Sequence, residues 1–155
     1  MFKKMLRYFF MYGIRRTLAK ALYKFDTNAA YFMLKILYMP GRKLDKRIVF
    51  LGMGNHGFTL LAFFVSVVGR QRVSAVIDPS EKSRKIALKV LGCPHFSNIE
   101  SAKADGEFYG DIIYIASDHI SHTKHAVTAN SFFDRLYVEK PLFVNSHQLE
   151  EFKIL

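Results

Sequence analysis

The chain has 155 residues, of which half are apolar and 15% aromatic, so a hydrophobic core can form and general disorder is excluded. Its single cysteine, Cys93, excludes a disulfide scaffold and a metal site built from a cysteine cluster, and we expect it to be a buried small side chain. The formal net charge of +10 suggests nucleic acid or an anionic membrane as a partner.

The excess of basic over acidic residues is confined to the first part of the chain. Residues 1–47 contain 12 basic and 2 acidic residues, which accounts for the whole net charge and leaves residues 48–155 neutral. We therefore divide the chain into a basic helical extension, residues 1–45, and a nearly neutral body, residues 46–155. No nucleic-acid partner is expected, because no known DNA- or RNA-binding motif accompanies the charge.

Within the extension, residues 1–25 are predicted to form a helix, because apolar residues recur at spacings of three or four. The resulting stripe consists of Leu6, Phe10, Ile14, Leu18, Leu22 and Phe25. A second helix is predicted at residues 29–38, after an N-cap at residues 26–28. No apolar stretch approaches the roughly 20 residues of a membrane span, and a signal peptide is disfavoured by the arginines that interrupt and follow the apolar stretch.

Two interpretations of the extension remain open. Its stripe packs against the same protein or a partner, or it is a basic amphipathic helix that lies on an anionic membrane. We accordingly expect a cytoplasmic protein, either free or peripheral at the inner face of the membrane.

In the body, short apolar runs alternate with helical segments. Strands are predicted at residues 47–53, 73–77, 95–96, 111–116 and 135–139. Helices are predicted at residues 55–68, 80–91, 98–104 and 119–130, and from a cap at Ser146 to the end. Gly92 is expected to end the second of these helices as a C-cap. The alternation predicts an α/β fold with a doubly wound parallel sheet of the Rossmann type.

Three glycines follow the first of these strands and open the first helix of the body, in the spacing of a dinucleotide fingerprint. Gly52 allows a tight turn, Gly54 lets a pyrophosphate approach the backbone, and Gly57 lets the helix pack closely on the strand. The helix N-terminus then offers free N–H groups to the phosphates. The alternative is an ordinary turn between a strand and a helix.

Asp78 ends the second strand of the body, 21 residues after Gly57. Its carboxylate can accept hydrogen bonds from both ribose hydroxyls of NAD and would repel the 2′-phosphate of NADP. NAD is therefore the expected cofactor and NADP the less favoured one, although the basic residues Lys82 and Arg84 lie just downstream. The alternative role for Asp78 is the N-cap of the next helix.

Two further stretches follow the fourth and fifth strands: Ala116-Ser-Asp-His-Ile-Ser-His122 and Glu139-Lys-Pro141. With the glycine fingerprint, they resemble the Gfo/Idh/MocA oxidoreductase family over roughly residues 46–155. The family usually has Thr, Pro and Asn where this chain has Ser117, Asp118 and His119. The stretch around Ser117 also resembles members with a basic helical N-terminal extension that are associated with surface-polysaccharide gene clusters.

The resemblance implies which residues act in the site. The residues implied in cofactor binding are Gly52, Gly54, Asn55, His56, Gly57, Asp78, Ala116, Ser117, His119, His122 and Glu139. Lys140 matches a lysine beside the reacting sugar carbon, where it can polarise the hydroxyl and help to transfer its proton. The bond between this lysine and the following proline, here Pro141, is often cis. His125 is expected at the surface. No metal site is expected, since no carboxylate or cysteine lies at ligand spacing on a second element.

Full-length members of the family have a second α/β domain that supplies most of the substrate pocket and usually the oligomer interface. The resemblance therefore implies the cofactor-binding half of an NAD(P)-dependent oxidoreductase for a sugar or sugar nucleotide, truncated before its C-terminal domain. The alternative is a short non-catalytic protein that binds a dinucleotide, a membrane surface or a partner. A SAM-dependent methyltransferase also has an acidic residue after its second strand, but Glu139-Lys-Pro141 argues against that class.

Overall fold

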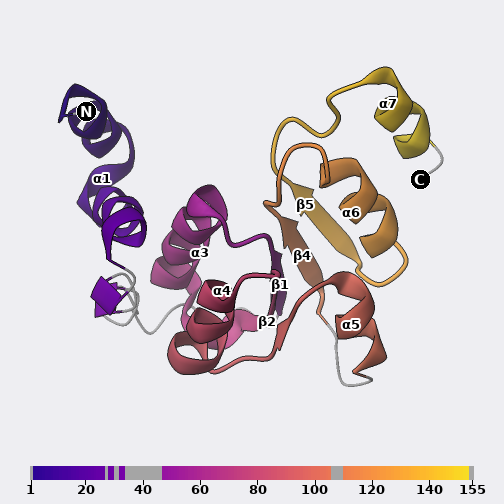
Figure 1. Cartoon of the computed structure of the whole chain (residues 1–155), viewed down its shortest axis with the longest axis horizontal. Coiled ribbons are helices and arrows are strands. Elements are labelled where there is room, and N and C mark those ends of the chain that lie inside the picture. Colours follow the sequence, from indigo (N-terminus) through magenta and orange to yellow (C-terminus); the bar gives the residue numbers. More distant parts are fainter. Residues whose placement is uncertain (1, 27, 30–31, 34–46, 106–109, 154–155) are drawn as a thin grey trace.

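The computed structural model describes residues 2–26, 28–29, 32–33, 47–105 and 110–153. After the helix α1 (Phe2–Phe25), strands and helices alternate along the chain (Figure 1). The strands are β1 (Ile48–Leu51), β2 (Val73–Ile77), β3 (His95–Phe96), β4 (Ile112–Ile115) and β5 (Arg135–Val138). The helical segments are α3 (Asn55–Val68), η1 (Arg70–Arg72), α4 (Glu81–Ile86), η2 (Ala87–Leu91), α5 (Ile99–Ala104), α6 (His122–Ala129) and α7 (Ser146–Phe152).

The described strands form one parallel sheet in the order β3-β2-β1-β4-β5. The chain begins at the central strand, winds outward through β2 and β3, then returns to the other side of β1 to add β4 and β5. Each side of β1 is thus wound in a different direction, which confirms the predicted Rossmann-type, doubly wound α/β fold. The switch point between the two halves lies between β1 and β4.

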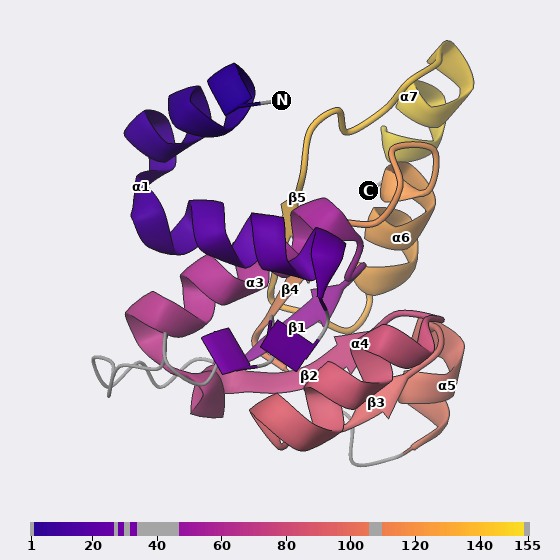
Figure 2. The ribbon, with the colours of Figure 1, turned by 60° about the vertical axis from the view of Figure 1, so that its left-hand side comes forward.

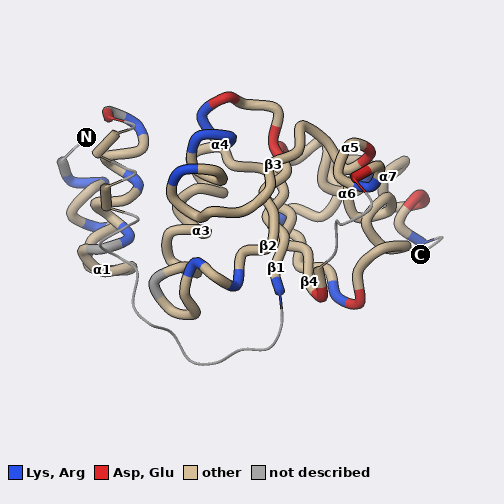
Figure 3. The backbone as a smooth tube through the Cα atoms, turned by 90° about the horizontal axis from the view of Figure 1, so that it is seen from below, with Lys and Arg blue, Asp and Glu red and all other residues tan. Residues whose placement is uncertain are grey.

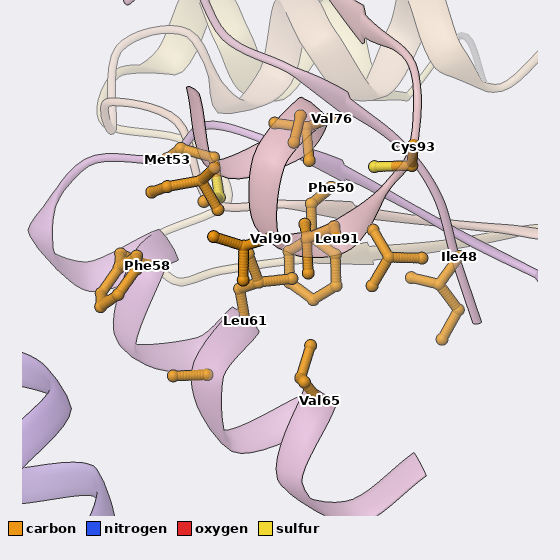
Figure 4. Close-up of a cluster of buried hydrophobic side chains, with 14 of the residues drawn as sticks. Ile48, Phe50, Met53, Phe58, Leu61, Val65, Val76, Val90, Leu91 and Cys93 are labelled. Carbon is orange, nitrogen blue, oxygen red and sulfur yellow. The ribbon is translucent and has the colours of Figure 1, made fainter. Parts of the chain in front are cut away.

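Helices cover both faces of the sheet (Figures 1 and 2). On one face, Ile48 and Phe50 of β1 pack with α3 and with the helical segments α4 and η2, as Figure 4 shows. On the other face, Val49 and Leu51 pack with α5 and α6. The strand is therefore buried on both sides, which is why its sequence is a continuous apolar run rather than an alternating one.

The segment from α4 to η2 has the predicted ends. The Ser80 side chain accepts a hydrogen bond from the backbone N–H of Ser83, and Gly92 follows with φ of 71°, the left-handed conformation of a glycine C-cap. Cys93 comes next and is buried, as expected. Burial raises the pKa of its thiol to about 12, so the thiol stays protonated at neutral pH.

Two other helix boundaries differ from the prediction. The helix predicted from residue 119 begins at His122, because the Asp118 carboxylate accepts hydrogen bonds from both the backbone N–H and the hydroxyl of Ser121 and so fixes a turn before it. In α7 the cap is Asn145 rather than Ser146, since the Asn145 side chain accepts from the backbone N–H of residue 148.

The prediction for α1 was right in length and wrong in its packing face. Gly13, with φ of 78° and ψ of 167°, divides the helix into two halves, so no single stripe runs along it. The second half buries Thr17, Ala19 and Tyr23 on the body instead. Leu6, Phe10, Ile14 and Leu18 of the predicted stripe are exposed, Leu22 is half-buried, and the Phe25 side chain lies outside the described residues.

The helix predicted at residues 29–38 lies mostly outside the described residues, although residues 28–29 and 32–33 are helical. No helix in the described part of the chain is long and apolar enough to cross a membrane.

Candidate functional site

A cavity of about 620 Å³ opens at the carboxyl ends of β1, β2 and β4. Its walls include the glycine loop after β1, Asp78 after β2, Asn98 before α5 and Ser117 after β4. This is the switch point of the sheet, the place where open parallel sheets bind their ligands. Motifs that lie far apart in the sequence therefore meet around one hollow.

The glycine loop is shaped by two close backbone contacts and one open position. A Cβ on Gly52, whose φ is 91°, would lie 2.4 Å from the backbone nitrogen of Ser117, and a Cβ on Gly57 would lie 2.0 Å from the carbonyl oxygen of Gly52. A Cβ on Gly54 would meet nothing within 4 Å. The backbone at Gly54 therefore borders open space at the N-terminus of α3, where a phosphate group fits.

Asp78 connects the glycine loop to the turn after β2. Its Oδ2 accepts a hydrogen bond from the backbone N–H of Met53 at 2.6 Å, and its Oδ1 accepts from the backbone N–H and the hydroxyl of Ser80 at 2.8 and 2.5 Å. Ser80, not Asp78, caps the next helix. Three of the carboxylate's four acceptor positions are used, and the Ser80 hydroxyl can turn away to free a second position for a ligand hydroxyl.

The three histidines after β4 have different environments. His122 is only 1% exposed, and its Nδ1 and Nε2 lie 2.7 Å and 3.1 Å from the carbonyl oxygens of Pro141 and Ser117. His119 is exposed and lies outside the cavity wall. His125, expected at the surface, is instead half-buried and lines the cavity, with its Nδ1 2.9 Å from the Ser117 hydroxyl. Burial lowers the pKa of His125 and favours its neutral form.

Glu139 links the end of β5 to the glycine loop. Its Oε1 accepts a hydrogen bond from the Tyr114 hydroxyl, and its Oε2 lies 3.5 Å from Nε2 of His56. Burial alone would raise the pKa of Glu139, but the Tyr114 hydrogen bond and the adjacent His56 outweigh it and hold this pKa below its usual value. Burial and the Glu139 charge together raise the pKa of Tyr114. Glu139 therefore stays a carboxylate with both oxygens engaged.

The turn that carries Lys140 is fixed from α6. The peptide bond between Lys140 and Pro141 is cis, as the resemblance implied. His122 holds the Pro141 carbonyl, and the Thr123 hydroxyl donates to the carbonyl of Leu142 at 2.7 Å. The exposed Lys140 side chain makes no hydrogen bond or ion pair with the described residues, so its amine is available to a ligand.

The structure gathers part of the predicted set at the cavity wall: Gly52, Gly54, Asn55, His56, Asp78 and Ser117. Gly57 and Ala116 pack behind this wall, and Glu139 reaches it through His56. Other wall residues were missed by the sequence prediction: Asn98, Glu100, Lys124, His125 and Thr128. They lie on or before α5 and α6, where ordinary polar residues at a helix surface give no signal in a sequence. Among the described residues, no group of three His, Cys, Asp or Glu side chains is placed to hold a metal ion.

Comparison with solved structures relates this fold to dehydrogenases. A protein from Bordetella bronchiseptica RB50 assigned as a dehydrogenase has 28% sequence identity and a TM-score of 0.57. Myo-inositol 2-dehydrogenase from Lactobacillus plantarum has 19% sequence identity and a TM-score of 0.59. A protein from Thermotoga maritima that is assigned as a dehydrogenase has 18% sequence identity and a TM-score of 0.54. Each alignment covers 70% of this chain but only 28%, 32% and 33%, respectively, of the other.

None of the curated proteins matches this chain. The model of the GFO_IDH_MocA oxidoreductase family, described as having an NAD-binding Rossmann fold, matches residues 46–155. This match spans the glycine loop, the whole sheet and the turn at Lys140. This chain therefore belongs to the Gfo/Idh/MocA family of oxidoreductases, through an NAD-binding Rossmann domain.

Proposed function

We propose that this chain is the cofactor-binding half of an NAD-dependent oxidoreductase that oxidises a secondary alcohol of a sugar or sugar nucleotide. The observation that supports this proposal is the convergence of three motifs at one end of the sheet. The glycine loop and Asp78 border the cavity, and the contact between His56 and Glu139 ties the Lys140 turn to it.

The cavity fits a nicotinamide dinucleotide in its shape and its donors. The open backbone at Gly54 suits the pyrophosphate, and Asp78 suits the adenosine ribose. Ser117 and His125, on the other side of the cavity, suit the nicotinamide half. When bound, the nicotinamide ring supplies the hydride acceptor of the reaction.

We propose NAD rather than NADP, because the nearby basic side chains are engaged elsewhere. Lys82 donates a hydrogen bond to the carbonyl oxygen of Tyr23 at 2.7 Å, and Arg84 lies 3.4 Å from Glu81. Neither residue lines the cavity. The Asp78 carboxylate would therefore repel a 2′-phosphate without compensation from Lys82 or Arg84. The lysine of the cavity wall, Lys124, lies on α6 next to His125.

Lys140 is proposed to bind the substrate hydroxyl and receive its proton. Its amine has no competing partner among the described residues, and its backbone is held by the bonds that His122 and Thr123 make to the next two carbonyls. A fixed backbone with a free amine suits a group that must meet a substrate in one orientation. Glu139, already bonded on both oxygens, is proposed to position this turn beside the cofactor.

The chain spans about a third or less of the length of the solved relatives compared above. We propose that the substrate pocket is completed, and any oligomer formed, by the second domain that the family resemblance implies. We also propose that this chain belongs to the group of members that have basic N-terminal extensions and are associated with surface-polysaccharide gene clusters. The helix α1, which contains basic residues and no acidic ones, supports this proposal. The division at residues 45 and 46 remains a prediction.

Calorimetric titration of the folded chain with NAD, NADP and S-adenosylmethionine tests the proposal. We expect NAD to bind in the micromolar to millimolar range, NADP to bind more weakly and S-adenosylmethionine not to bind. Absence of NAD binding by a sample with a cooperative thermal transition would contradict the dinucleotide site. Preferential binding of S-adenosylmethionine would replace it with a methyltransferase-type site.

A further inference from the structure

The N-terminal half of α1 presents an apolar surface that no described part of the protein covers. Phe10 is 76% exposed, and Leu6, Phe9 and Met11 are also exposed. The other half of α1 is firmly attached to the body: the Tyr23 hydroxyl donates to the Met53 carbonyl at 2.5 Å, and its ring stacks on Phe58. Beyond the break at Gly13, the first half extends at an angle away from the sheet (Figure 2).

This half-helix separates apolar from basic side chains. At about 100° per residue, Leu6, Phe9 and Phe10 lie on one side of the helix, and Lys3, Lys4 and Arg7 gather on the adjoining side. The whole of α1 contains seven basic residues and no acidic one. Figure 3 shows this concentration of positive charge on α1, in contrast to the mixed charges around α5, α6 and α7.

A cleft at the elbow of α1 continues the basic side of this half-helix, because Lys4 belongs to both. It measures about 440 Å³ and lies between the two halves of the helix. Lys4 lines it from the first half, and Lys20 and Lys24 line it from the second, together with the Tyr8 and Thr17 side chains. Lys20 also lies 4.3 Å above the Tyr8 ring, which shows how closely the halves approach across the elbow.

We propose that the N-terminal half of α1 docks the protein on an anionic phospholipid bilayer. The apolar side would enter the boundary between headgroups and acyl chains, and Lys3 and Arg7, the basic residues nearest to that side, would meet lipid phosphates. A second copy of the chain fits this surface less well, because it would bring a second acid-free helix against the first. Nucleic acid fits it less well, because a phosphate backbone leaves the large apolar side chains in water.

Flotation of the full chain with lipid vesicles tests this docking surface. We expect binding to vesicles of phosphatidylcholine with 30% phosphatidylglycerol, little binding to pure phosphatidylcholine, and weaker binding as salt rises. The double variant Leu6→Ser/Phe10→Ser should reduce partitioning at least about tenfold. Lys3→Gln/Arg7→Gln should reduce it by about fivefold for each charge removed.

Matched variants on another surface distinguish specific binding through α1 from nonspecific adsorption of the protein to vesicles. Leu88→Ser removes a side chain that is 53% exposed, and Lys85→Gln/Lys89→Gln removes two exposed charges. Both should bind vesicles like the wild type, and all variants should keep the wild-type melting temperature and NAD affinity.

Two results would overturn the proposal: the folded wild type fails to float with anionic vesicles, or the control variants lose as much binding as the α1 variants. If the wild type fails to float and Phe10→Ser abolishes self-association or binding of duplex DNA, a second copy or nucleic acid replaces the membrane as the partner. Because NAD titration is a separate measurement, failure of this proposal is distinguishable from failure of the proposed oxidoreductase function.

Discussion

Replacing Gly57 or Gly54 by alanine should separate the two tasks of the glycine loop. In Gly57→Ala the new Cβ would lie 2.0 Å from the carbonyl oxygen of Gly52, more than 1 Å inside normal contact. The Cβ is rigidly attached to the backbone, and the carbonyl is part of it. The start of α3 must therefore move away from the loop. Overpacking of this kind costs about 1–3 kcal/mol, and we expect the upper end because no flexible side chain can yield.

Gly54→Ala is the matched comparison, since its Cβ meets nothing within 4 Å and its φ of −59° suits alanine. Its effect on the free energy of unfolding should stay within about 1 kcal/mol. The methyl group would, however, stand where the pyrophosphate is proposed to approach, so NAD affinity should fall at least about tenfold, as expected for a lost backbone contact to a charged group.

Circular-dichroism melting and calorimetric titration with NAD measure the two effects. A loss of about 3 kcal/mol corresponds to a melting temperature lowered by about 6–12 °C for a domain of this size. A Gly57→Ala variant that melts within about 2 °C of the wild type would refute the argument from backbone contact. A Gly54→Ala variant that binds NAD normally would refute the placement of the pyrophosphate.

Three further substitutions test contacts around the loop. Tyr114→Phe should lower the free energy of unfolding by about 1–3 kcal/mol at pH 7 and raise the pKa of Glu139. Because the pKa of Glu139 is depressed in the folded state, the difference in stability between wild type and variant should shrink as the pH falls through this pKa, which urea unfolding from pH 7 to 3 measures. Asp78→Asn should weaken NAD binding about 10- to 100-fold in titration while changing NADP binding less. Tyr23→Phe should lower the free energy of unfolding by about 1–2 kcal/mol, because the buried Met53 carbonyl loses its donor.

The first two of these substitutions have controls on the same molecule. Tyr137→Phe removes the hydroxyl of a neighbouring ring that is 52% exposed, and its stability should match that of the wild type at every pH. Asp134→Asn removes an exposed carboxylate outside the cavity wall and should leave NAD selectivity unchanged. If a control changes as much as its partner, the specific contact is not the cause.

The sheet and the glycine loop could be predicted from local sequence. A run such as Ile48–Leu51 is apolar throughout because the strand is covered on both faces, and that pattern is present without any knowledge of the fold. Gly52, Gly54 and Gly57 likewise have the spacing that is typical of a strand, tight turn and helix. Structural features that depend on residues close together in the chain can therefore be predicted from the sequence alone.

Contacts between distant residues were decided only by tertiary packing. His125 lines the cavity because the fold brings its ring to the Ser117 hydroxyl after β4. The side chains of Asp118 and Ser121 set the start of α6 at His122 rather than three residues earlier. In the sequence Tyr114 cannot be distinguished from an ordinary strand residue. The pairing of β4 with β5 nevertheless brings its hydroxyl within hydrogen-bond distance of the Glu139 carboxylate. Nothing in either residue's neighbourhood along the chain specifies the other.

The basic extension shows the same division between sequence and structure. Its helix and its lack of acidic residues follow directly from the sequence. Which face packs does not, because Gly13 rotates one half of α1 against the other and replaces the regular apolar stripe with a surface built around Ala19 and Tyr23. Periodicity identifies a helix and its apolar positions, whereas the fit against α3 and the loop at Met53 selects the ones that are buried.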